Sequence, residues 1–201
     1  MKLAMFGGSF DPVHNDHIGL CNTMLQSLSL DKVVVFPAAC SPFKDDTQTD
    51  SLHRFNMCKL AFEAYDNVDV SDFEIKRGGK SYTVDTLKFL SEKYKGAELF
   101  LITGADAFLT LSSWYKASEI FSLAHILTVV RDNDNIDVLK AKAKEYEAYN
   151  AKCILINTPV GNLSSTKVRS ALKNREDVRD FLPQSVIDYI IENGLYGYGN
   201  Y

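Results

Sequence analysis

Two histidines lie three residues apart, shortly after a pair of glycines, in the segment Gly7-Gly8-Ser9-Phe10-Asp11-Pro12-Val13-His14-Asn15-Asp16-His17. An apolar run, 3–6, precedes this segment, and apolar residues at helical spacing follow it. The pattern predicts a strand, a turn that contains the glycines, and a helix start. Because a helix start offers unpaired N–H groups and a positive dipole end, it is an anion site. The two imidazoles favour a phosphate that is stabilised during a reaction; a plain turn with solvated histidines is the simpler alternative.

Further side chains suited to phosphate binding follow the other apolar runs. Lys44 lies in a polar loop after the second run, and Gly104 and Asp106 follow the run at 99–102. The last run is followed by Asn162-Leu163-Ser164-Ser165-Thr166-Lys167-Val168-Arg169, another helix start. Carboxyl ends of parallel strands share one sheet edge, so these residues are expected to face the histidines there. Helix capping alone also explains a hydroxyl at this point, and a single loop lysine is commonly solvated.

The elements that must position these residues alternate along the chain. Strands are expected at 3–6, 33–36, 68–70, 99–102, 126–130 and 153–156, with an extension of the third over 72–75. Helical patterns separate them, including one that starts near Ser51 as its N-cap. Continuous apolar strands separated by helices predict an α/β fold with a doubly wound, Rossmann-like parallel sheet and helices on both faces. We expect one domain over 1–201, with a small helical C-terminal part over about 160–201.

Composition excludes several classes of protein. The 201 residues are 46% hydrophobic and 24% charged, which is typical of a folded domain. A net charge of -4 argues against broad nucleic-acid binding, an RNA-binding module included. No apolar run is long enough for a membrane span or a signal-peptide core. The four cysteines are scattered without CxxC spacing, so we expect reduced thiols and a cytoplasmic protein. The motifs of covalent serine catalysis, Walker loops and dinucleotide-binding glycine loops are also absent from the sequence.

Taken together, these residues resemble a known family. Residues 8–17 resemble the signature G-[ST]-F-D-P-x-H-x-G-H of the nucleotidyltransferase superfamily, and residues 163–169 resemble its second signature, I-S-S-T-x-[IV]-R. The blocks Asp72-Phe73-Glu74, Ser81-Tyr82-Thr83-Val84-Asp85-Thr86-Leu87 and Gly104-Ala105-Asp106 with Trp114 are similar to bacterial nicotinate-nucleotide adenylyltransferases. The tail 182–196 is similar as well, so the resemblance covers nearly the whole chain.

The resemblance implies adenylyl transfer from ATP to nicotinate mononucleotide, which gives deamido-NAD and pyrophosphate. It implies that the catalytic residues are His14, His17, Lys44 and Arg169. It implies ATP contacts at Gly7, Gly8, Ser9, Phe10, Gly104, Asp106, Ser164 and Ser165. Thr83 and Trp114 would bind the mononucleotide, with Trp114 stacked on the pyridine ring; by composition alone, Trp114 is equally a core residue. The cofactor would be Mg²⁺, held through the ATP phosphates without protein ligands.

Two positions depart from the family pattern. Asp16 replaces the glycine between the histidines, where its carboxylate could repel ATP, point away or help to place Mg²⁺. Phe43 replaces the histidine of a P-H-K loop that matches Lys44, which removes one polar contact. Transfer onto nicotinamide mononucleotide stays an alternative, as does a nucleotide-binding regulator with weakened catalysis. The Ser-Tyr-Thr block and Trp114 argue against phosphopantetheine as acceptor, and the residues leave open a homo-oligomer.

Overall fold

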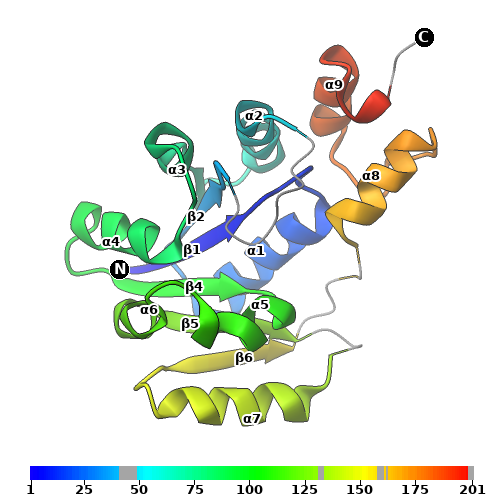
Figure 1. Ribbon diagram of the computed structural model, residues 1–201. Coiled ribbons are helices and arrows are strands. Elements are labelled where there is room, and N and C mark those ends of the chain that lie inside the picture. Colours follow the sequence, from blue (N-terminus) through cyan, green and yellow to red (C-terminus); the bar gives the residue numbers. More distant parts are fainter. Residues whose placement is uncertain (41–48, 131–133, 158–160, 162, 199–201) are drawn as a thin grey trace.

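Six parallel strands form one sheet in the order β3-β2-β1-β4-β5-β6 (Figure 1). The computed structural model describes residues 1–40, 49–130, 134–157, 161 and 163–198. The strands are β1 (Lys2–Gly8), β2 (Lys32–Pro37), β3 (Val68–Val70), β4 (Glu98–Thr103), β5 (His125–Val130) and β6 (Cys153–Asn157). The α-helices of the described part are α1 (Asn15–Leu28), α2 (Ser51–Phe62), α3 (Phe73–Arg77), α4 (Thr83–Lys93), α5 (Ala105–Thr110), α6 (Ala117–Leu123), α7 (Ile136–Glu147), α8 (Ser165–Lys173) and α9 (Gln184–Glu192). Two short 3₁₀ helices, η1 (Leu111–Ser113) and η2 (Leu195–Gly197), complete them.

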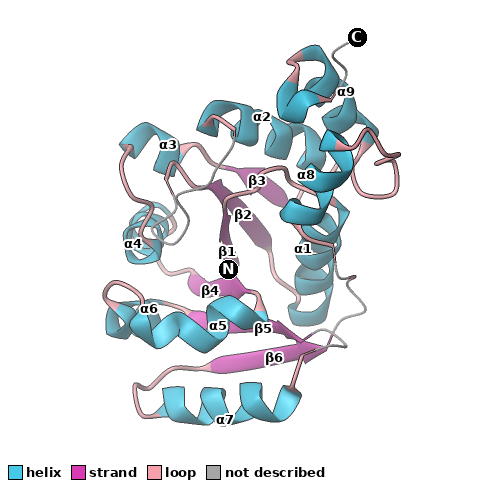
Figure 2. Cartoon of the chain, turned by 45° about the vertical axis from the view of Figure 1, so that its right-hand side comes forward, coloured by secondary structure: helices cyan, strands magenta, loops and turns pink. Residues whose placement is uncertain are grey.

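Helices cover both faces of the sheet, as Figure 2 shows for α1 and α8 on one side and α3 and α4 on the other. Side chains alternate along each strand: Ala4 and Phe6 of β1 belong to one core cluster, and Leu3 and Met5 belong to the other. The first cluster takes in α1, α2, α8 and α9, and the second takes in α4 to α7. The expected doubly wound α/β fold is therefore confirmed.

Two helices begin at residues that the signatures supply. His14 is the N-cap of α1, with extended backbone (φ -145°, ψ 171°), so the helix starts between the two histidines. Ser164 is the N-cap of α8, and its Oγ accepts the backbone N–H of Lys167 at 3.2 Å. Both helix starts lie past the carboxyl ends of strands β1 and β6. Helix capping therefore accounts for the hydroxyl of Ser164. It does not account for Ser165 and Arg169, which lie inside the helix.

Three local expectations are corrected. Gly7 and Gly8 continue strand β1 and pair with residues 36 and 37 of β2, so the turn starts only after them. The N-cap of α2 is Asp50, whose carboxylate accepts the N–H of Leu52 at 2.8 Å. Residues 72–75 do not extend β3 but start helix α3. There tertiary contacts decide the local structure, because the ring of Phe73 stacks on Phe89 of α4 at 3.9 Å between centroids.

The C-terminal helices share the core of the sheet. Val168 and Leu172 of α8 and Val186 and Ile190 of α9 are fully buried in the same cluster as α1 and α2. Both views place α9 next to α2, and α7 next to the edge strand β6 (Figures 1 and 2). Within the described ranges, no helix combines the length and the apolar character that a bilayer span requires.

Candidate active site

Gly8 lets an aromatic ring approach the end of β1. A Cβ on Gly8 would lie 3.1 Å from two ring carbons of Phe10, so the ring would have to give by a few tenths of an ångström. Phe10 itself has a left-handed backbone (φ 48°), and its ring is buried edge-on against Phe6 and against the imidazole of His17. The ring of Phe10 therefore packs against His17, while the backbone around Phe10 turns from strand β1 into α1.

The two histidines stack on each other at the start of α1. Their ring centroids lie 3.6 Å apart at an interplanar angle of 25°; His14 is buried and His17 is half-buried. The backbone N–H of His14 donates to Nδ1 of His17 at 3.2 Å. Because Nδ1 accepts this hydrogen bond, a neutral His17 carries its proton on Nε2. The fold therefore orients His17 as a hydrogen-bond donor through Nε2.

The second signature is joined to the first by side-chain hydrogen bonds. Nη1 of Arg169 donates to the carbonyl oxygen of Asp11 at 2.8 Å, and Oγ of Ser165 donates to that of Pro12 at 3.0 Å. The helix starts of α1 and α8 are thereby held together, although about 150 residues separate them. We call residues 11–17 with residues 163–169 the clamp. It brings His14, His17, Ser164, Ser165 and Arg169 to one place, as the sequence predicts.

Buried Arg54 of α2 fastens the segments beneath the clamp. Its guanidinium donates to the carbonyl oxygens of Ser9 (2.6 Å), Ala38 (2.6 Å), Ala39 (3.3 Å) and Thr49 (3.1 Å). Burial lowers the pKa of Arg54, and the negative charge of Asp11 opposes that shift. The side chain thus connects the ends of β1 and β2 and adds a positive charge behind them. No sequence motif identifies Arg54, since a lone arginine in a helix resembles a surface residue.

A cavity of about 660 Å³ lies at the carboxyl ends of β1 and β4. Seven of the predicted site residues line it: Gly7, Gly8, Ser9, Thr83, Gly104, Asp106 and Trp114. The segment 7–9 belongs to the cavity wall and leads directly into the clamp. Among the described lining residues there is no lysine, arginine or histidine, but there are two acids, Glu74 and Asp106. The cationic side chains of the two signatures, Lys167 and Arg169, belong to the clamp and not to this lining.

Glu74 is a buried acid of the cavity wall that the resemblance noted without a role. Oγ1 of Thr86 donates to its carboxylate at 2.6 Å, and burial raises the pKa of Glu74. The hydroxyl of neighbouring Ser81 accepts the N–H of Ala39 at 3.0 Å, and its own hydrogen bond to Glu74 partly offsets the pKa shift. Together these contacts fix the start of α4, and hence Thr83, against the loop that follows β2.

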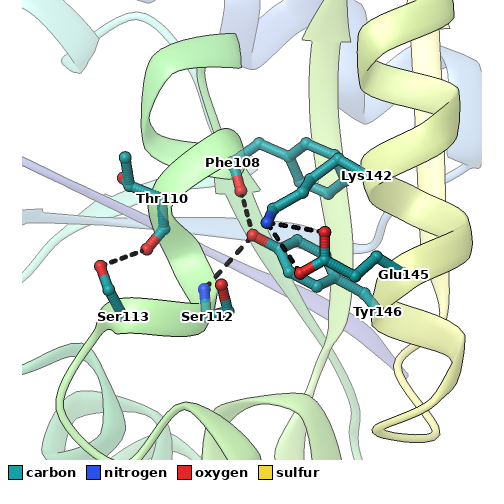
Figure 3. A network of polar contacts seen from close by, with 7 residues as sticks. All are labelled: Phe108, Thr110, Ser112, Ser113, Lys142, Glu145 and Tyr146. Carbon is teal, nitrogen blue, oxygen red and sulfur yellow. Dashed lines mark hydrogen bonds and ion pairs between the residues drawn. The ribbon is translucent and has the colours of Figure 1, made fainter.

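A second network of polar contacts joins α7 to the junction of α5 and η1, as Figure 3 shows. The hydroxyl of Tyr146, a fully buried residue of α7, donates to the carbonyl of Phe108 at 2.6 Å and accepts the N–H of Ser112 at 3.2 Å. These bonds pin the junction of α5 and η1, directly before Trp114 at the C-cap of η1. Trp114 is half-buried and lines the cavity, so its ring is both packed and accessible to a ligand.

Two predicted site residues, Lys44 and Phe10, remain to be placed. Lys44, with Phe43 and Asn162, lies outside the described residues. The aromatic ring of Phe10 is buried beneath His17, so a contact to ATP would come from its backbone. Tyr196 near the C-terminus donates to the buried carboxylate of Asp11 at 2.6 Å; burial, then this hydrogen bond, raises the pKa of Tyr196.

A doubly wound sheet with paired histidines and a second helix start at one edge is the arrangement of a nucleotidyltransferase. Residues 5–171 match the cytidylyltransferase-like family model. A probable nicotinate-nucleotide adenylyltransferase of Clostridium novyi is 36% identical over 197 residues, covering 97% of this chain and 98% of that protein. A protein of the same description from Clostridium beijerinckii is 36% identical over 201 residues, with the same coverage. The chain belongs to the cytidylyltransferase-like family and, within it, to the nicotinate-nucleotide adenylyltransferases.

Solved structures share the fold. Plasmodium falciparum nicotinic acid mononucleotide adenylyltransferase complexed with NaAD superposes with a TM-score of 0.79 over 98% of both chains, at 22% sequence identity. The likeness extends through the C-terminal helices, because nearly the whole of this chain is covered.

Proposed function

We propose that this protein transfers the adenylyl group of ATP to nicotinate mononucleotide and releases pyrophosphate. The observation that carries the proposal is the joining of the two signatures, one from each end of the chain, next in sequence to residues 7–9, which line a cavity together with Trp114. The family relatives are described as enzymes of this activity, and a structural neighbour was solved with NaAD. The product here is accordingly deamido-NAD.

The reaction is a single displacement at phosphorus. An oxygen of the mononucleotide 5′-phosphate attacks the α-phosphorus of ATP, and the bond from that phosphorus to the bridging oxygen breaks as pyrophosphate leaves. The protein supplies position and charge stabilisation, with no enzyme-bound intermediate. In the clamp, Nε2–H of His17 donates to the α-phosphate as negative charge develops there. His14 contacts the same phosphates and stacks on His17, which limits the motion of both rings.

The β- and γ-phosphates bind at the start of α8. Backbone N–H groups at a helix start and the dipole favour an anion there. Ser164 and Ser165 flank this start, and Arg169 lies one turn further, with one guanidinium nitrogen used on Asp11. Lys44 is proposed to neutralise phosphate charge from the loop after β2.

Adenosine and nicotinate occupy the cavity. Adenosine binds along Gly104 and Asp106, and the mononucleotide binds along Thr83 and Trp114. The nicotinate carboxylate is recognised by hydroxyl and backbone N–H donors of the cavity wall. The start of α4, at Thr83, offers such donors together with a favourable helix dipole.

The proposed cofactor is Mg²⁺. Nowhere in the described ranges do three or more His, Cys, Asp or Glu side chains gather as a metal site. Magnesium ions commonly keep several waters and bind through substrate phosphates, and we propose this mode of binding here. When bound, the ion neutralises charge on the ATP phosphates; the clamp residues orient those phosphates.

The test is product formation from both substrates. ATP and nicotinate mononucleotide with Mg²⁺ are expected to give deamido-NAD and pyrophosphate in equal amounts, and omission of either substrate abolishes both. Binding of ATP without any pyrophosphate release would contradict the proposal and favour a nucleotide-binding regulator.

A further inference from the structure

Asp16 makes a direct contact from α1 to the other half of the clamp. Its carboxylate oxygen Oδ2 accepts the backbone N–H of Leu163 at 2.8 Å. Leu163 is buried and immediately precedes Ser164, the N-cap of α8. The contact therefore fixes the backbone at the point where α8, and with it the second half of the clamp, begins.

Gly161 adds an independent sign that the carboxylate and this segment are fitted together. A Cβ on Gly161 would lie 3.2 Å from Oδ1 and 3.3 Å from Oδ2 of Asp16. A side chain at position 161 would therefore crowd the carboxylate of Asp16, which would have to give by a few tenths of an ångström. The contact that the carboxylate makes with this segment is its hydrogen bond to Leu163.

The position of Asp16 in α1 makes the negative charge tolerable. Asp16 is the second residue of the helix, where exposed N–H groups and the dipole stabilise an anion. A hydrogen bond from a neutral donor to a charged acceptor is stronger than one between neutral groups. Of the hydrogen bonds that join residues 11–16 to residues 163–169 in the described structure, this one alone uses a carboxylate.

We propose that Asp16 is a positioning residue for ATP: its hydrogen bond to Leu163 sets the start of α8 at the distance from His14 and His17 that the polyphosphate requires. The inference rests on the proposed function, because it assigns the clamp to ATP. It makes the hydrogen bond, and not the negative charge, the property that ATP binding depends on.

The test compares Asp16→Ala with Asp16→Asn. D16N removes the charge but keeps a side-chain carbonyl oxygen that can accept the Leu163 N–H, so this variant is expected to stay within about threefold of wild type. D16A loses the bond, and the KM for ATP is expected to rise about tenfold, the size of one charge-assisted hydrogen bond. The KM for nicotinate mononucleotide stays within about twofold, because the cavity is not touched.

A matched control has the same chemistry elsewhere. Oδ2 of Asp31 accepts the backbone N–H of Lys2 at 2.6 Å, at the opposite end of β1. D31A therefore also removes a carboxylate that binds a backbone N–H, and it is expected to leave both KM values unchanged. Thermal melting of all three variants shows whether they fold.

Calorimetric titration with ATP separates this inference from the proposed function. If wild type forms no deamido-NAD, the proposed function fails, and the ratio of ATP Kd values for D16A and D16N still tests Asp16. Equal weakening in D16A and D16N would overturn the inference, because the charge would then be the active property. Unchanged ATP binding in D16A, or an equal rise in both KM values, would overturn it too.

Discussion

Removal of the Arg54 guanidinium is expected to loosen the end of β1 on which the clamp is built. In Arg54→Met the side-chain stem is kept, but the carbonyls of Ser9, Ala38, Ala39 and Thr49 lose their donors. The two bonds at 2.6 Å, to Ser9 and Ala38, are the shortest and carry most of the loss. An unsatisfied buried polar group costs about 1–3 kcal/mol, so two of them cost about 2–6 kcal/mol. For a chain of this size, that lowers Tm by roughly 10 °C.

The effect on substrate binding depends on which carbonyl loses its hydrogen-bond donor. Ser9 lies in the cavity wall and leads into the clamp, so R54M is expected to raise the KM values for ATP and for the mononucleotide together, about tenfold each. R54K keeps a positive charge but cannot reach all four carbonyls, so it recovers only part of the loss. Differential scanning calorimetry and steady-state kinetics measure both effects.

Arg77→Met is the control. The guanidinium of Arg77 forms an ion pair with the carboxylate of Asp85 at 3.0 Å, and the Arg77 side chain is 31% exposed. Such a surface ion pair contributes less than about 1 kcal/mol to stability. A Tm of R54M within about 3 °C of R77M, with unchanged KM values, would refute the reasoning. Full recovery in R54K would show that the charge, and not the set of carbonyl contacts, is what matters.

Three further predictions concern the site itself. His17→Ala is expected to lower kcat about 10²-fold or more, the usual cost of a lost preorganised donor, and a near-normal rate would refute the role given to His17. Trp114→Ala is expected to raise the KM for the mononucleotide about tenfold or more with ATP affinity little changed; equal losses for both would count against stacking. Burial raises the pKa of Glu74 above its ordinary 4.5, so the unfolded chain loses this proton first as pH rises. The stability of the wild type therefore falls as the pH rises from about 4.5 to the pKa of the folded protein. Glu74→Gln lacks this titration, so the stability of E74Q relative to wild type should grow from about pH 4.5 upward in chemical denaturation; a difference that stays constant with pH would contradict it.

The sequence predicted the fold and the gathering of polar residues because both depend on local patterns. The apolar runs near Val33 and Ile126 are short and continuous, which indicates strands covered on both faces. The edge that collects the site follows from parallel strands and right-handed crossovers. The family signatures then supplied the roles proposed for His14 and His17.

What the sequence did not predict depends on contacts between distant residues. Arg54 and Tyr146 act through backbone carbonyls and amides of other elements, for which no motif exists. The sequence pattern predicted an extended segment where helix α3 lies. The stacking of Phe73 on Phe89, which accompanies the helix, arises only in the folded chain and leaves no local pattern in the sequence. Asp16 stood in the sequence as an unexplained carboxylate, and its partner at Leu163 is 147 residues away.

The most direct test of the central claim compares two acceptors in one assay. ATP is supplied with nicotinate mononucleotide or with nicotinamide mononucleotide at equal concentrations, and kcat/KM is measured for each. We expect a preference for nicotinate of about 10-fold to 100-fold, since hydrogen bonds to its carboxylate contribute about 1.5–3 kcal/mol. Equal rates, or a preference for the amide, would contradict the assignment of the cavity to nicotinate.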